Sequence, residues 1–151
     1  MKEFESIEDV LDFAIEREQE AADFYTNLAK NAKNVVMKKT FEDYAKEEMG
    51  HKARLEKIKN GGSYTLKSGE IMDLKIGDYL VGGKVSENIS YQDALILAMK
   101  REKSAYKLYT KLSQKAPTLE LEILFRDLAN EEAKHKLRFE TEYDDVVLKD
   151  N

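Results

Sequence analysis

Two glutamate–histidine pairs are the residues whose types and spacing point to chemistry. The pentads EEMGH (47–51) and EEAKH (131–135) end in His51 and His135, the two histidines of the chain. In each pentad the second glutamate precedes the histidine by one helical turn on the same face, so the two side chains could bind one metal ion. A single Glu-x-x-His on a charged helix arises easily by chance, and usually marks an exposed ion pair. Two copies in register are a stronger indication of a metal site.

The offset of 84 residues between the pentads extends to much of the chain. Aligned without a gap, residues 6–55 and 90–139 share 19 identical residues among 50 positions. Two copies of this period are too few and too long for a solenoid, and they indicate a duplicated two-helix hairpin. Each copy starts at a serine that can cap a helix, in SIED (6–9) and SYQD (90–93).

The repeat predicts an all-α chain of four helices, organised as one domain over residues 1–151. The first hairpin covers 6–60 and breaks at Asn34, and the second covers 90–143 and breaks at Pro117. Between them, residues 61–89 start with a glycine pair and are expected to form a crossover with a short helix or strand pair. Residues 144–151 are expected to form a tail without a functional signal.

The apolar stripe of each expected helix is interrupted by polar residues at one level only. The first and third helices carry one glutamate there, and the second and fourth carry a glutamate and a histidine: Glu18, Glu102, Glu48, His51, Glu132 and His135. Four buried carboxylates would repel one another unless they were protonated or neutralised. Two divalent cations would balance four glutamates and two neutral histidines. The pattern therefore predicts a dimetal site with these six residues as ligands.

Four further residues are expected to support the ligands. Glu47 and Glu131 share a face with the histidines but lie about 100° off the stripe, which favours flanking positions. Tyr25 and Tyr109 follow a stripe glutamate by seven residues on the same face. They are interpreted either as ordinary core tyrosines or as hydrogen-bond partners of a ligand carboxylate.

Composition excludes several other classes of function. The net charge is −5 and no basic cluster stands apart from acidic neighbours, so nucleic acid is not an expected partner. The absence of cysteine removes disulfides and thiolate metal sites. No stretch approaches the roughly 20 apolar residues that span a bilayer, and the acidic start MKEFESIEDV is unlike a signal peptide. The expected location is the cytoplasm, without membrane association.

These residues resemble the ferritin-like di-iron carboxylate proteins, in particular the rubrerythrin-like branch. The segments REQEAADFY (17–25) and REKSAYKLY (101–109) look like the glutamate-bearing helices of the family, and the two pentads look like its Glu-x-x-His helices. The resemblance covers about residues 6–140 and implies a four-helix bundle with a long crossover between the second and third helices. It implies two iron ions, one held by Glu18, Glu48 and His51 and the other by Glu102, Glu132 and His135, with Glu48 and Glu132 bridging.

The resemblance implies redox chemistry with O2 or H2O2, in an oxidative-stress or iron-oxidation role. Two departures qualify this. Rubrerythrins carry a rubredoxin module with four cysteines, and a chain without cysteine would need an external electron-donor protein. They also have an extra glutamate three residues after the ligand of the third helix. Ala105 occupies that position here, so the resemblance does not imply their peroxidase activity.

Several alternatives stay open on the sequence. Manganese or zinc would fit the same donor set as iron. The chain could bind or store iron or manganese without turnover, or it could be a helical interaction module with a vestigial site. A homodimer is also compatible with the sequence, because the long linker between two similar hairpins would let subunits exchange them.

Overall fold

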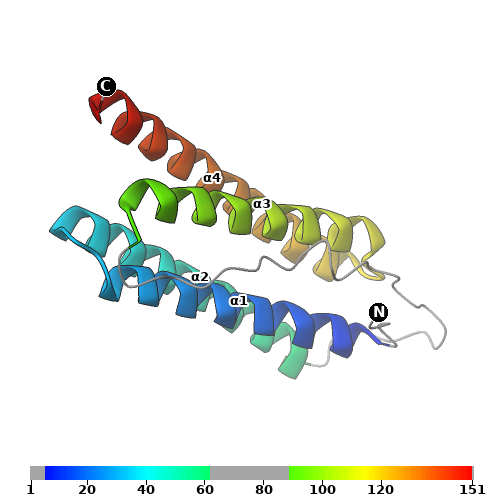
Figure 1. Ribbon diagram of the computed structural model, residues 1–151. Helices are drawn as coiled ribbons and strands as arrows, with labels where there is room; N and C mark the ends of the chain where they lie inside the picture. Colours follow the sequence, from blue (N-terminus) through cyan, green and yellow to red (C-terminus); the bar gives the residue numbers. More distant parts are fainter. Residues whose placement is uncertain (1–5, 62–88, 151) are drawn as a thin grey trace. The chain divides into compact units, whose positions relative to one another are not determined.

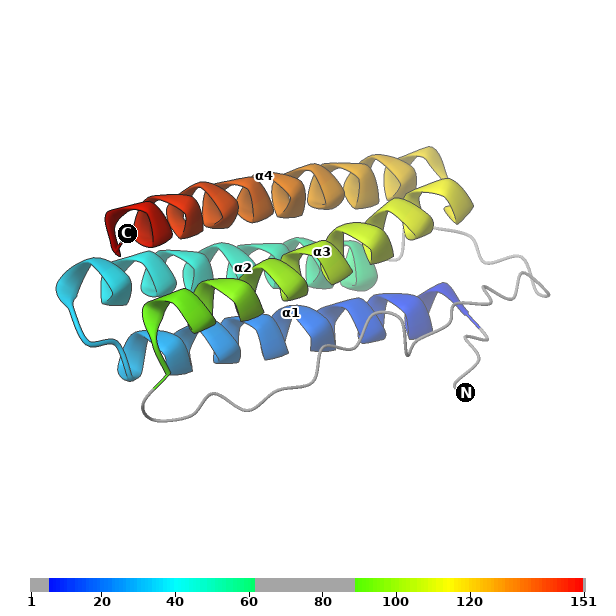
Figure 2. The ribbon, with the colours of Figure 1, turned by 45° about the horizontal axis from the view of Figure 1, so that its top comes forward.

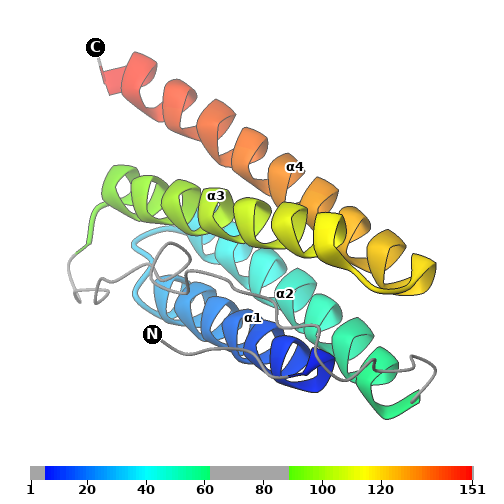
Figure 3. The ribbon, with the colours of Figure 1, turned by 90° about the vertical axis from the view of Figure 1, so that its right-hand side faces the viewer.

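A computed structural model describes residues 6–61 and 89–150 of the chain, with side chains described as far as Leu148. Within these ranges the chain is helical and contains no strand (Figure 1): α1 (Ile7–Lys30), α2 (Val35–Gly61), α3 (Tyr91–Lys115) and α4 (Leu119–Asp150). The chain divides into two compact units, in which α1 packs on α2 and α3 packs on α4. Figures 2 and 3 show that the two helices of each unit run antiparallel and side by side.

The first helix of each hairpin begins at a serine, as the sequence predicts. The hydroxyl of Ser6 accepts a hydrogen bond from the backbone N–H of Asp9 at 3.1 Å. The hydroxyl of Ser90 accepts the equivalent bond from Asp93 at 3.0 Å. Each serine satisfies an amide that the helix itself leaves without a partner. The same cap therefore fixes where α1 and α3 start.

The turns between the paired helices also end in capping residues. The side-chain oxygen of Asn34 accepts a hydrogen bond from the backbone N–H of Met37 at 2.8 Å. The hydroxyl of Thr118 accepts one from Leu121 at 3.2 Å. Pro117 restricts the backbone of the residue before it to extended conformations, and α3 accordingly ends at Lys115. Both helix pairs turn where the sequence predicts, and the capping residues Asn34 and Thr118 lie 84 positions apart, like the other features of the repeat.

Aromatic rings fill the core between α1 and α2. The ring of Tyr25 stacks on Phe41 with centroids 6.0 Å apart, and it also contacts Tyr44 at 5.7 Å and Phe24 at 5.2 Å. In the second hairpin the ring of Tyr109 stacks on Phe125, with centroids 6.3 Å apart. Leucines complete the two cores, and those that are fully buried include Leu11, Leu28, Leu55, Leu95 and Leu112.

Two features of the helices bear on the predicted boundaries. α2 ends at Gly61, where the glycine pair predicts a stop, but the rest of the expected crossover lies outside the described residues. α4 runs to Asp150, so the predicted helix end at Tyr143 and the tail after it are wrong. No glycine or proline follows Tyr143, and nothing in the local sequence stops the helix. None of the four helices is long and apolar enough to cross a bilayer.

Candidate metal centre

The α1–α2 hairpin brings two carboxylates and one imidazole together. Glu18 comes from α1, and Glu48 and His51 come from successive turns of α2. The imidazole Nδ1 of His51 lies 3.5 Å from the carboxylate Oε2 of Glu18 and 3.6 Å from Oε1 of Glu48. Each of the three residues offers one ligand atom, and these atoms lie within 4.8 Å of one another. This spacing suits a single metal ion between them.

The α3–α4 hairpin repeats this arrangement. Glu102 comes from α3, and Glu132 and His135 come from α4. The imidazole Nδ1 of His135 lies 3.6 Å from the carboxylate Oε1 of Glu102. One ligand atom from each residue again falls within 4.8 Å of the other two. Each hairpin therefore brings together, from its own two helices, three of the six residues that the sequence pattern singles out.

All six side chains are buried, which is unusual for charged residues. The exposed fraction is 2% for Glu18, 1% for Glu48 and 4% for His51. In the second trio the values for Glu102, Glu132 and His135 are 1%, 1% and 5%. Two ionised glutamates and one neutral histidine carry a formal charge of −2, which one divalent cation balances. The donor set of carboxylate oxygen and imidazole nitrogen fits iron, manganese or zinc.

The four residues expected to support the ligands occupy different environments. Tyr25 and Tyr109 are fully buried, and their ring contacts place them in the hairpin cores. Glu47 is exposed, whereas Glu131 is partly buried. Flanking roles for the two glutamates, and hydrogen bonds from the tyrosines to a ligand, stay predictions.

Two structural features next to the ligands are not predicted from the sequence. The guanidinium of Arg17, adjacent to Glu18 in the chain, lies 4.7 Å from the ring centroid of Phe13 and forms an ion pair with Glu20 at 2.7 Å. A groove also opens between α1 and α2, and Met49, which follows Glu48, lines it. The repeat does mark Arg17, because Arg101 occupies the equivalent position. The groove leaves no comparable signal, since exposed side chains follow no fixed pattern.

Comparisons with solved structures show the fold class. A hypothetical protein from Pyrococcus furiosus is 28% identical, with a TM-score of 0.70 over 92% of this chain and 89% of that chain. A putative ferritin-like diiron-carboxylate protein from Thermotoga maritima is 20% identical, with a TM-score of 0.76 over 95% of this chain and 97% of that chain. The predicted fold class, an all-α ferritin-like four-helix bundle, is confirmed.

Comparison with family models identifies the family. No curated protein matches the chain. The model of the Rubrerythrin family matches residues 9–143, which include all six candidate ligands. With the ferritin-like fold and the two buried trios, this match shows that the chain belongs to the rubrerythrin family.

Proposed function

We propose that the chain is a non-haem di-iron carboxylate protein. One iron ion would be held by Glu18, Glu48 and His51, and the second by the equivalent trio of the α3–α4 hairpin, Glu102, Glu132 and His135. The observation that carries the proposal is the presence of two buried trios of the same composition, one in each hairpin. Membership of the rubrerythrin family supports iron as the metal.

The proposed activity is the reduction of O2 or H2O2 in the cytoplasm. A bound iron pair would supply the change of oxidation state. Reduction of one H2O2 takes two electrons and two protons and gives two waters. The electrons would come from an external donor protein, because the chain has no cysteine for a rubredoxin-type centre, or from ferrous iron as substrate.

The side chains of the protein would perform three tasks in this activity. The six ligands would hold the metal ions in place, and their four carboxylates would offset the positive charge of the ions. Their burial, at 5% exposure or less, limits the access of bulk water. The rings of Tyr25 and Tyr109 pack in the hairpin cores, about two helical turns after Glu18 and Glu102, and add to the apolar surroundings.

Anaerobic loading with ferrous iron tests both the metal centre and its chemistry. We expect two iron ions per chain by elemental analysis, and oxidation of both to the ferric state after mixing with O2 or H2O2, followed by Mössbauer spectroscopy. Glu48→Ala and Glu132→Ala are the matched controls, and each should lower the iron content. Iron that stays ferrous with both oxidants would exclude the redox function. A protein that binds no metal would instead indicate a helical interaction module.

A further inference from the structure

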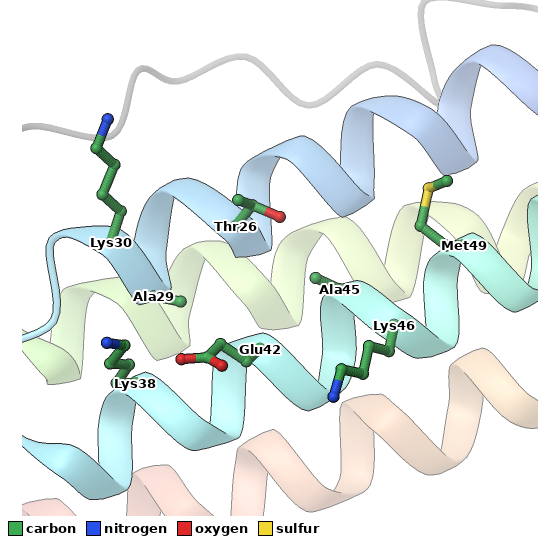
Figure 4. A pocket seen from close by; sticks show the side chains of 8 residues that line it. All are labelled: Thr26, Ala29, Lys30, Lys38, Glu42, Ala45, Lys46 and Met49. Atoms are coloured by element: carbon green, nitrogen blue, oxygen red, sulfur yellow. The ribbon is translucent and has the colours of Figure 1, made fainter.

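A groove of about 680 Å³ lies between α1 and α2 (Figure 4). Its volume is in the range of a small-molecule site. It is lined by Thr26, Ala29, Lys30, Lys38, Glu42, Ala45, Lys46 and Met49. The two alanines are buried and leave the groove open, because they are too small to fill it. Met49 is 42% exposed at its edge. The groove therefore combines apolar walls with an edge of long charged side chains.

The charged side chains of the groove have no counter-ions in the described part of the chain. The groove is lined by three lysines and one glutamate, so its formal charge is +2, in a chain whose net charge is −5. The four residues are Lys30, Lys38, Lys46 and Glu42. None of these four side chains forms an ion pair within residues 6–61 and 89–148. Lys39, which does not line the groove, pairs with Asp43 at 3.6 Å. The groove thus offers unpaired positive charge beside exposed apolar surface.

A stripe on α4 has the complementary properties. Leu137 and Leu148 are 63% and 71% exposed. Thr141, Asp144 and Asp145 lie on the same face between them, by their helical spacing, and are also exposed. Neither aspartate forms an ion pair with another described residue. We refer to these five residues as the α4 stripe.

The position and the length of the α4 stripe both suit the groove. The hydroxyl of Tyr91, the first residue of α3, donates a hydrogen bond to Glu142 at 3.0 Å, so α4 continues beyond the start of α3. From Leu137 to Leu148 the stripe spans about 16 Å at the rise of an α-helix. The groove residues Lys38 and Met49 on α2 are separated by the same number of residues. An amphipathic helix lying in an apolar groove is a common mode of recognition.

We propose that the α4 stripe of a second copy of the chain docks in this groove. The two aspartates of the α4 stripe oppose the formal charge of +2 in the groove, and both surfaces expose apolar side chains. In a twofold dimer each copy supplies one groove and one stripe, which gives two identical contacts. The aspartates would meet the lysines of the groove, and the two leucines would cover its apolar walls.

Charge reversal at the two surfaces gives a direct test by light scattering and analytical ultracentrifugation. The full-length protein is expected to be a dimer. The groove variant Lys38→Glu/Lys46→Glu and the stripe variant Asp144→Lys/Asp145→Lys should each weaken self-association by roughly tenfold or more, because both contacts then join like charges. Lys107→Glu/Lys111→Glu makes the same change of charge at exposed positions on α3 and should leave the dimer intact.

Mixing the two variants separates the proposal from a general effect of charge. In a heterodimer the acidic groove meets the basic stripe, and the basic groove meets the acidic stripe, so both contacts are favourable. The mixture should therefore associate where each variant alone does not. Circular dichroism confirms that each variant is folded, and Leu148→Ser provides an uncharged second disruption. A monomeric wild type, a dimer unaffected by both variants, or a mixture that stays monomeric would each overturn the proposal.

Discussion

The α1–α2 and α3–α4 hairpins are alike at their cores and different on their surfaces. Both carry two buried glutamates and a buried histidine, both stack a tyrosine on a phenylalanine, and both start their first helix at a serine cap. A buried position admits few side chains, because the residue must fill a fixed volume and satisfy its polar atoms. The duplicated hairpins therefore still agree where side chains are buried.

The surfaces show how far the two copies have diverged. The groove residues Lys30, Lys38 and Lys46 correspond, 84 positions later, to a glutamine, a glutamate and an asparagine. In the first hairpin the ammonium of Lys59 pairs with Asp12 at 2.5 Å across the two helices. Hydrogen bonds from Tyr91 to Glu142 and from Gln92 to Tyr143 join the helices of the second hairpin. An exposed position constrains its residue weakly, so each copy could acquire its own contacts.

Removing one ligand from each trio tests whether the two cores are equivalent. Of the changes considered, it should have the largest effect on the stability that the protein gains from metal. Each divalent metal ion at about 100 times its dissociation constant should stabilise the wild type by about 2.7 kcal/mol, since it binds only the folded state. Glu48→Ala and Glu132→Ala should each lose most of the contribution of the ion in the affected trio. Thermal unfolding with and without metal measures it, and the metal-free variants should equal or exceed the metal-free wild type because a buried charge is gone. A large loss in only one variant would show that the trios differ in function.

Truncation of the stacked phenylalanines compares the packing of the two cores. Phe41 and Phe125 are both fully buried. Phe41→Ala and Phe125→Ala should each lower the free energy of unfolding by about 3–5 kcal/mol, because each leaves a cavity. Denaturant titration of both variants provides the measurement. A difference of more than about 2 kcal/mol between them would indicate that one core relaxes around the cavity and the other does not.

Removing the capping side chains at the two turns should lower the free energy of unfolding by less than truncating the phenylalanines. Asn34→Ala and Thr118→Ala each remove a side-chain acceptor at the start of a helix, at an expected cost of about 1 kcal/mol. The effect should be larger for Asn34, whose hydrogen bond is 2.8 Å long against 3.2 Å for Thr118. Chemical denaturation compares the two, with Thr118→Ser as a control that keeps the hydroxyl. The opposite order would show that bond length is not what sets the strength of these caps.

The contacts between helices at the surface should give the smallest effect. A double-mutant cycle on Lys59 and Asp12 is expected to yield a coupling energy of about 0.2–1 kcal/mol, because both side chains are partly exposed. Salt at about 1 M should remove most of it. The cycle on Tyr91 and Glu142 should respond less to salt, since only one partner is charged. Equal salt dependence would contradict the distinction between the two surfaces.

The internal repeat explains why so much of the fold was predictable. Ser6, Asn34, Ser90 and Thr118 are small polar residues next to apolar-periodic segments, and the structure places all four at helix starts. Local hydrogen bonding decides such positions, so the sequence nearby contains the information. The end of α4 could not be predicted in this way, because no glycine or proline after Tyr143 marks where the helix stops.

The residues of the candidate site could be predicted from the sequence, but the surface around it could be predicted only in part. The spacing of Glu48 and His51 predicts a shared face, and the structure places both near Glu18. That a glutamate is buried follows from its place in an apolar stripe. The groove beside Met49 could not be predicted in this way, because it depends on how far apart two helices lie where Ala29 and Ala45 face each other.

The short turns that close the two hairpins also bear on how the protein is made. Most contacts within a hairpin of this kind join residues close in sequence, which favours rapid folding. Ribosomes add about 5–20 residues per second, whereas helices form within microseconds. These rates leave time for the α1–α2 hairpin to form while α3 is still being synthesised. Glu18, Glu48 and His51 would then come together first, and a metal ion taken up by the nascent chain would meet these three ligands before the others exist.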